Sequence, residues 1–186
     1  MKRTKTTKLT AFVAVLALFT LGSCDGFAPT VKVPFTSEAE FDLASATVKT
    51  VADDNEVLLT TWTFDQDVNT LISDYGGDPE KIKESNVITV TLTYVGELEV
   101  DLTQIVTSLK LMIDKNPAEL EELVAQSTEV GTNSISFEVI KGDIFDYTLG
   151  DNGFTFLLYG VVDQTNMPQV VDVNITVSAE LVVELL

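Results

Sequence analysis

The sequence predicts an all-β protein, an antiparallel β-sandwich of about eight strands with short helical turns, either immunoglobulin-like or jelly-roll-like. Apolar and polar residues alternate with a period of two through most of the chain after residue 30, which is typical of half-buried strands. Turn signals separate these segments at the spacing expected of an antiparallel sandwich. Helix signals are few and short.

The clearest strand is the C-terminal segment, residues 171–185, in which every odd position is apolar. Polar residues such as Asp172, Asn174 and Glu180 fill most even positions. A helix would scatter these two sets around its circumference. We therefore expect one long or bent strand here.

The remaining strands follow from the same alternation. Residues 31–35 alternate clearly, and residues 41–48 predict a strand with a kink or bulge near Ser45. In the next strand Leu58, Thr60, Trp62 and Phe64 are expected to share one face. Further strands are expected at 87–95, 109–113, 135–139 and 154–162; the last follows a hairpin-type turn and is apolar on both faces, which predicts a central strand.

Three short helical segments carry local start or stop signals. Asp67 can cap a helix from Val68 to Tyr75, and Gly76 can end it. An Asp-Pro pair opens a second turn at 80–84. A cap, a first-turn proline and a glutamate over residues 116–119 head a third segment, which these signals predict to be helical through 126.

The N-terminal residues differ in composition from the rest. Lys2, Arg3, Lys5 and Lys8 precede an uncharged apolar stretch at 9–21. In helical form that stretch spans only about 20 Å, short of the roughly 30 Å hydrocarbon core of a bilayer. The pattern predicts a secretory signal peptide.

The stretch ends in Leu21-Gly22-Ser23-Cys24, which resembles the lipobox of bacterial lipoproteins. The resemblance implies cleavage between Ser23 and Cys24 and a diacylglycerol on the Cys24 thiol. An acylated cysteine also avoids leaving a lone thiol in an oxidising compartment. We therefore expect a protein of the bacterial cell envelope held by lipid in the outer membrane, on its periplasmic or its surface side. The expected parts are a signal peptide at 1–23, a lipidated tether at 24–30 and a single sandwich domain at 31–186.

The charge balance excludes several classes of function. The chain has 11 Lys and Arg against 29 Asp and Glu, with no histidine, for a net charge of -18. Its only arginine is Arg3, in the signal peptide. Without histidine there is no Ser-His-Asp triad and no Cys/His zinc cluster. Without arginine, and with so many acids, binding of phosphates is disfavoured. We expect no enzyme and no nucleic-acid or nucleotide partner.

A second resemblance covers much of the chain after residue 30. The segments 67–72, 75–76, 81–83, 87–94 and 143–147 in succession are similar to uncharacterised β-sandwich lipoproteins of Gram-negative bacteria. The resemblance implies a sandwich with short helical turns and no assigned active site. It also implies an extended conformation near 118–126, so whether 117–126 is helix or strand stays open.

Acidic turns are the candidates for a metal ion. Asp65, Asp67 and Asn69 begin like an EF-hand loop, but Thr70 and Gly76 stand where that loop needs Gly and Glu. Weaker calcium candidates are Asp53, Asp54 and Glu56 in one turn, and Asp143, Asp146 and Asp151 in another. We expect no cofactor, with calcium as the one alternative.

The aromatic residues are the candidates for ligand contact. Trp62, Tyr94 and Tyr159 lie in apolar strands and are expected to be buried. Tyr75 and Tyr147 lie in turns, where exposed rings could contact a ligand. The resulting hypothesis is a lipid-anchored, non-enzymatic binding or scaffolding module that contacts a glycan or an envelope protein. The alternative is a calcium-stabilised structural or adhesion domain.

Overall fold

The computed structural model describes residues 28–45, 56–64, 67–97, 99–114, 121–148, 154–163, 165 and 167–185. Within these ranges eight strands form one antiparallel sheet, which confirms the all-β prediction. The strands are β1 (Thr30–Asp42), β2 (Val57–Phe64), β3 (Gly77–Tyr94), β4 (Val106–Asp114), β5 (Glu122–Val130), β6 (Ser134–Val139), β7 (Phe154–Val162) and β8 (Asp172–Leu185); the helices are α1 (Val68–Asp74) and α2 (Phe145–Thr148), with 3-10 turns at Leu43–Ser45 and Leu102–Gln104.

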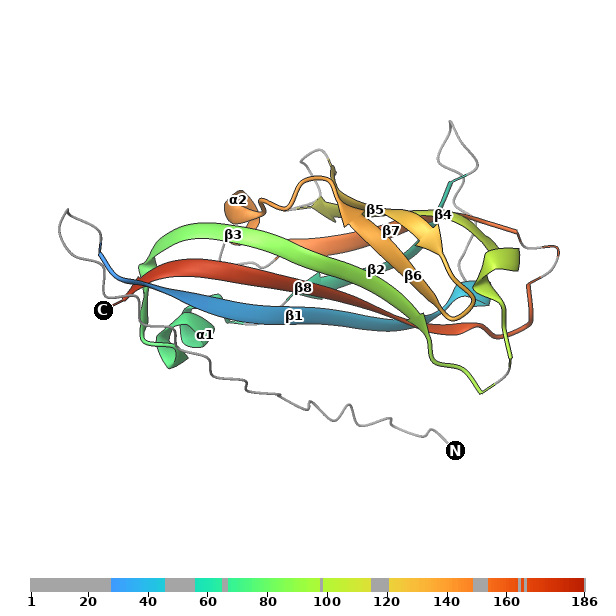
Figure 1. The fold of residues 1–186 in the computed structure, drawn as a ribbon, viewed down its shortest axis with the longest axis horizontal. Helices are drawn as coiled ribbons and strands as arrows, with labels where there is room; N and C mark the ends of the chain where they lie inside the picture. The colour runs from blue at the N-terminus through green and yellow to red at the C-terminus, as the bar shows by residue number, and fades with distance from the viewer. Residues whose placement is uncertain are drawn as a thin grey trace.

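The sheet curls into two layers (Figure 1). Its strand order is β1-β8-β3-β6-β5-β4-β7-β2. We call β1, β8 and β3 the front layer, and β5, β4, β7 and β2 the back layer. Strand β6 pairs with β3 and with β5, so it carries the sheet obliquely from one layer to the other.

The two edge strands of the curled sheet, β1 and β2, meet through side chains. The rings of Phe35 and Phe64 lie 4.9 Å apart between centroids. The indole Nε1 of Trp62 donates to Ser37 Oγ at 2.9 Å. Because Ser37 is buried, this hydrogen bond satisfies a hydroxyl that would otherwise be costly to enclose. The sandwich is thus closed on its open side without a backbone ladder between these strands in the described residues.

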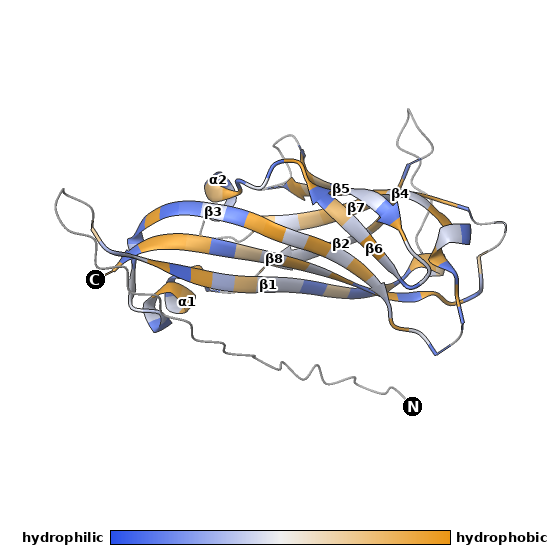
Figure 2. Cartoon of the chain, in the orientation of Figure 1, coloured by the Kyte–Doolittle hydropathy of each residue, from blue (hydrophilic) through white to orange (hydrophobic). Residues whose placement is uncertain are grey.

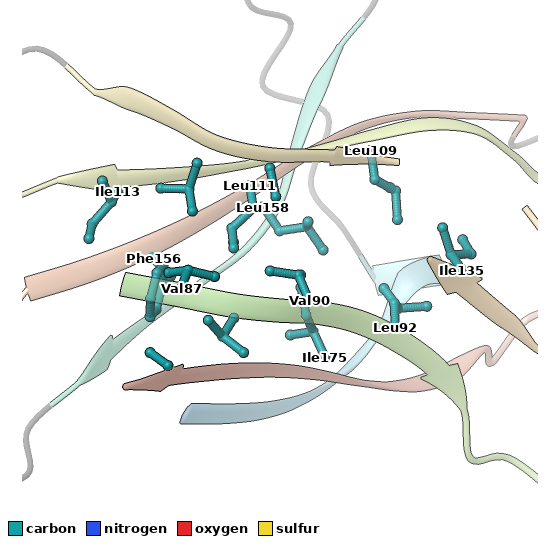
Figure 3. Packing of buried hydrophobic residues seen from close by; sticks show 14 of the residues in the cluster. Val87, Val90, Leu92, Leu109, Leu111, Ile113, Ile135, Phe156, Leu158 and Ile175 are labelled. Atoms are coloured by element: carbon teal, nitrogen blue, oxygen red, sulfur yellow. The ribbon is translucent and has the colours of Figure 1, made fainter. Parts of the chain in front are cut away.

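The core lies between the layers, where hydrophobic side chains from both interdigitate. Side chains such as Ile175 on β8 and Leu158 on β7 are fully buried. The alternation of hydrophobic and hydrophilic residues along β1, β3 and β8 (Figure 2) places their apolar side chains on the inner face. Figure 3 shows Val87, Val90 and Ile175 from the front layer facing Leu111, Phe156 and Leu158 from the back layer.

Strands β1 and β8 pair along their whole length. Leu43 N donates to Val171 O at 3.0 Å at one end, and Leu185 N donates to Pro29 O at 2.8 Å at the other. In an antiparallel pair alternate residues bond to the same neighbour, so the even-numbered residues of β1 direct their backbone groups to the free edge. Pro34 is among them, where its missing N–H breaks no ladder bond.

Helix α1 agrees with the local signals in the sequence. Asp67 Oδ1 accepts from the backbone N of Asn69 at 3.0 Å and of Thr70 at 3.2 Å, as an N-cap does. Gly76 follows the helix with a φ of 75°, a conformation that favours glycine. The predicted helix at 68–75 is confirmed to within one residue.

Two predicted helical segments are strands instead. Residues 80–84 belong to β3, where Ile82 pairs with Val183. Glu122–Val130 forms β5, between β4 and β6. In both places pairing with neighbouring strands overrides the local helix preference. For residues 122–126 the extended alternative implied by the second resemblance is confirmed; the cap at 116–119 lies outside the described residues.

Two details of the predicted strands are also wrong. Asp42 Oδ1 accepts from Ala44 N and from Val171 N, and the chain turns into a 3-10 helix at Leu43 instead of continuing as a strand. In β2 the register shifts between Leu58 and Thr60. This bulge turns Leu59 inward and Leu58 outward, so Leu58 does not share a face with Phe64.

Candidate functional site

The two layers present different outer faces. On the front layer, Thr91 on β3, Thr176 on β8 and Glu38 on β1 lie side by side in register. The neighbouring row is Thr89, Ser178 and Thr36, and the inward neighbours of all these residues fill the core. A solvated sheet face normally carries such polar residues.

The outer face of the back layer carries apolar residues instead. Met112 on β4 pairs with Leu157 on β7 and with Leu123 on β5, and Leu58 on β2 pairs with Tyr159 on β7. Directly paired residues project on the same side of a sheet. We call this group the apolar patch; its members are Leu58, Met112, Leu123, Leu157, Tyr159 and Val161, and their neighbours Leu111, Ile113, Phe156 and Leu158 point into the core.

Leu157 is the centre of the apolar patch. It is only 9% exposed, and among the described residues it is the one buried hydrophobic side chain outside the core cluster. Phe156 and Leu158 on either side of it are fully buried in that cluster. Since the core is filled from these two positions, Leu157 contributes to a separate hydrophobic group on the outside of the sheet.

Negative charges border the apolar patch. Tyr159 Oη donates to Glu121 Oε1 at 2.9 Å. Burial, together with the carboxylates of Glu121 and Asp114, raises the pKa of Tyr159 to about 12. Lys110 is the direct strand partner of Tyr159, and its Nζ lies 2.5 Å from Glu56 Oε1. Among the residues that the structure describes, three carboxylates and one ammonium group therefore lie beside the patch.

Every lysine that the structure describes has a carboxylate partner. Lys110 pairs with Glu56, Lys32 with Glu180, and Lys141 with Glu122. Lys81 and Lys83 both contact Glu184, and Lys81 also contacts Asp78. With a net chain charge of -18, the surface carries many more carboxylates than these lysines can neutralise, and it attracts cations.

The two tyrosines proposed for ligand contact are half-buried and pack against the core. Tyr75 caps α1 at its C-terminal end. Tyr147 Oη donates to Glu122 Oε2 at 3.0 Å. The hydrogen bonds from Lys141 and Tyr147 hold the pKa of Glu122 below its usual value. Tyr94 and Tyr159 are half-buried too, so exposure does not distinguish the turn tyrosines from those in strands.

Trp62 is half-buried against the core, as expected from its strand. Its ring lies 5.2 Å from that of Phe156, and its N–H is used by Ser37. Its only N–H donor is therefore not available to a stacked sugar.

The calcium candidates are not assembled in the part of the chain that the structure describes. Glu56 is engaged by Lys110, and Asp143 Oδ1 accepts from Phe145 N at 3.0 Å. Asp146 lies exposed on α2. Within the described ranges no three His, Cys, Asp or Glu residues come together in a way that could hold a metal ion. The candidates Asp53, Asp54 and Asp151, together with Ser23 and Cys24, lie outside those ranges.

No helix among the described residues combines the length and the apolar character needed to cross a membrane.

No protein-family model and no curated protein sequence matches this chain. Two solved structures are similar to it over nearly its whole length. A chain from the cryo-EM structure of Mud crab tombus-like virus is 6% identical, covers 99% of this chain and 94% of its own, and gives a TM-score of 0.36. A chain from Desmodium yellow mottle tymovirus is 13% identical, covers 100% and 98%, and gives a TM-score of 0.27. Similarity this low has no bearing on function.

The apolar patch was not predicted from the sequence, although two signals for it were visible. The segment 154–162 is apolar on both faces, which predicted only a central strand. The strand does lie between β4 and β2, but its outward residues Leu157 and Val161 are not covered by another described layer. Met112, between two core positions of β4, is the second such signal.

Proposed function

We propose that this protein is a lipid-anchored component of the bacterial cell envelope that binds another envelope protein and performs no catalysis. The apolar patch is the observation that supports binding. Contiguous apolar residues on the outside of a sheet, bordered by polar ones, are typical of protein interaction sites. The front layer of the same molecule has a mainly polar outer face, apart from the exposed Ile88 on β3, so the patch is not a general property of this sandwich.

A protein partner fits the described residues better than a glycan does. Sugar-binding surfaces commonly present an aromatic ring with one free face. Here the ring of Trp62 packs against the core and its N–H donates to Ser37, and the hydroxyls of Tyr147 and Tyr159 donate to glutamates. The patch offers mainly aliphatic and thioether groups, which suit apolar side chains of another protein.

The lipid anchor is supported by the sequence alone. The residues Leu21 to Cys24 follow a basic and then an apolar segment, in the order that export and lipidation require. A lipidated Cys24 would place the protein among the envelope partners that we propose. In this proposal no metal or other cofactor takes part.

Lipidation is tested by growing cells that express the full chain with a clickable fatty acid. We expect label on the wild type and none on Cys24→Ala. Absence of label from the wild type, or label on the variant, would refute the anchor.

Binding through the patch is tested by photo-crosslinking in intact cells. A photoreactive residue is placed at Thr61, which is exposed and pairs with Leu157, and as a control at Thr91, exposed on the front layer. We expect a discrete protein adduct from position 61 and none from position 91. Adducts from both positions, or from neither, would contradict binding through this face.

A further inference from the structure

We propose that the apolar patch binds a protein segment whose apolar side chains are accompanied by lysine or arginine residues. The inference rests on the proposed function, which leaves the chemistry of the partner open. It combines two properties of the same surface, its apolar centre and its acidic border.

The centre of the patch runs across the strands. Thr61, Leu157, Met112 and Leu123 are consecutive partners on β2, β7, β4 and β5. The next row contains Leu58, Tyr159, Lys110 and Gln126. The apolar members of these rows form a continuous strip, and a partner must place apolar side chains against it to exclude water.

The border of the patch selects positive charge. Glu121 Oε1 accepts a hydrogen bond from Tyr159 Oη at 2.9 Å, and Asp114 lies two residues after Met112 on the same face of β4. Lys110, the direct strand partner of Tyr159, is already engaged by Glu56 at 2.5 Å. Among the described residues at the border, carboxylates outnumber ammonium groups, and complementary charge steers a cationic partner to them while disfavouring an anionic one.

Two other occupants fit this surface less well. A second copy of the chain would bring the same carboxylates together and would add to the repulsion between two highly acidic molecules. An anionic lipid surface would be repelled for the same reason. A segment with basic residues beside apolar ones satisfies both the centre and the border.

The test uses full-length protein in neutral detergent micelles and short fluorescent peptides. The peptides alternate Leu with Lys, Leu with Glu, or Thr with Lys, and fluorescence anisotropy reports binding. We expect the Leu-Lys peptide to bind about tenfold more tightly than either of the others. Equal binding of Leu-Glu would overturn the charge requirement, and equal binding of Thr-Lys would overturn the apolar one.

Matched charge variants separate the patch from general attraction to an acidic protein. Met112→Glu and Thr176→Glu each add one negative charge, the first on the patch and the second on the front layer. General attraction would leave both variants binding the Leu-Lys peptide as tightly as the wild type or more tightly. Binding at the patch would make Met112→Glu weaker by about tenfold and leave Thr176→Glu within about twofold. Since the wild type and both variants are measured in the same detergent, differences in peptide affinity between them report on the protein surface.

A second substitution guards against loss of folding. Met112→Thr keeps a strand-forming residue and adds no charge. We expect it to weaken Leu-Lys binding while the melting temperature stays close to that of the wild type. Unchanged binding by Met112→Thr and Met112→Glu would overturn the proposal. The crosslink from position 61 would remain in that case, so a wrong partner chemistry is distinguishable from a wrong binding face.

Discussion

The outer faces of the front and back layers lie over one shared core, yet they differ in chemistry. The front layer presents mainly threonine, serine and glutamate side chains, such as Thr91, Thr176 and Glu38, with Ile88 as an exposed hydrophobic exception. The back layer presents Leu157 and Met112 at the equivalent outward positions. The core does not require this difference, because it is filled from the inner face in both layers. Apolar residues on the outer face depart from the usual pattern of polar residues on a solvated sheet face. Because the core does not need them there, they are expected to serve function.

The largest losses of stability are expected from substitutions in the core between the two layers. There, equivalent substitutions in the front and the back layer should cost similar amounts of unfolding free energy. Leu158→Ala in the back layer and Ile175→Ala in the front layer each remove a fully buried side chain. Each should lower the free energy of unfolding by about 2–5 kcal/mol, measured by urea denaturation. Leu157→Thr, one residue from Leu158 on the outer side, should cost less than Leu158→Ala, because Leu157 lies outside the core cluster. A cost for Leu157→Thr equal to that of Leu158→Ala would show that the patch is a part of the core.

A smaller effect is expected where the back layer is most tightly packed. A Cβ added at Gly160 would lie 2.6 Å from Leu109 Cδ2 and 2.8 Å from Leu59 Cδ1. Gly160→Ala should therefore cost about 1–3 kcal/mol through overpacking, again measured by urea denaturation. In the Leu59→Ala background the same change should cost less, because one of the clashing groups is gone. Equal costs in the two backgrounds would contradict this account.

The acidic border can be measured through the phenol of Tyr159. Subtracting the ultraviolet titration of Tyr159→Phe from that of the wild type should reveal a group with a pKa of about 12. Glu121→Gln should lower this pKa towards the ordinary value of about 10, whereas Glu38→Gln on the front layer should leave it in place. An equal shift from both variants would mean that the potential is not local to the patch.

The same group makes a small contribution to alkaline unfolding. Because the folded pKa lies above the unfolded one, the folded protein holds this proton more tightly, and the resulting stability is lost as the pH rises from about 10 to 12. Since Tyr159 is only half-buried and solvent partly screens its charge, the loss should be smaller than the full shift implies, about 1 kcal/mol. Tyr159→Phe should unfold with a weaker dependence on pH in that range.

The smallest effect is expected from calcium. Glu56 is held by Lys110, and Asp143 accepts a backbone hydrogen bond, so neither layer offers an assembled cation site in its described residues. Millimolar calcium should change the melting temperature by less than about 2 °C, with magnesium as the control. A specific rise with calcium would instead favour the calcium-stabilised alternative, since a ligand that binds only the folded state raises its stability.

The sequence predicts those parts of the fold that depend on local pattern. The alternation from Val171 to Leu185 is sufficient to identify β8, because one face of this strand is buried along nearly its whole length and the other face is partly exposed. Helix α1 is equally local, since Asp67 and Gly76 supply both of its ends. Both elements can therefore be predicted without knowing which strands lie beside them.

Other parts depend on pairing that the local pattern does not contain. Residues 122–126 carry helix signals but lie between β4 and β6, which supply the backbone hydrogen bonds of a strand. The bulge in β2 turns Leu58 outward, and an alternation rule that counts every second residue misses it. The candidate site was missed for the same reason: Met112, Leu123 and Leu157 come from three strands and become one surface only through their register.

The hydrogen bond between Leu185 and Pro29 bears on how far the sandwich can lie from the membrane. It places the start of β1 and the end of β8 at one end of the sandwich. With Cys24 lipidated as we propose, the five residues from 25 to 29 reach at most about 18 Å from the bilayer. The 13 residues of β1 then extend about 40 Å to the opposite end. With so short a tether and with the strands perpendicular to the membrane, the outer face of the back layer is parallel to the membrane normal. The apolar patch then faces other proteins anchored in the same membrane.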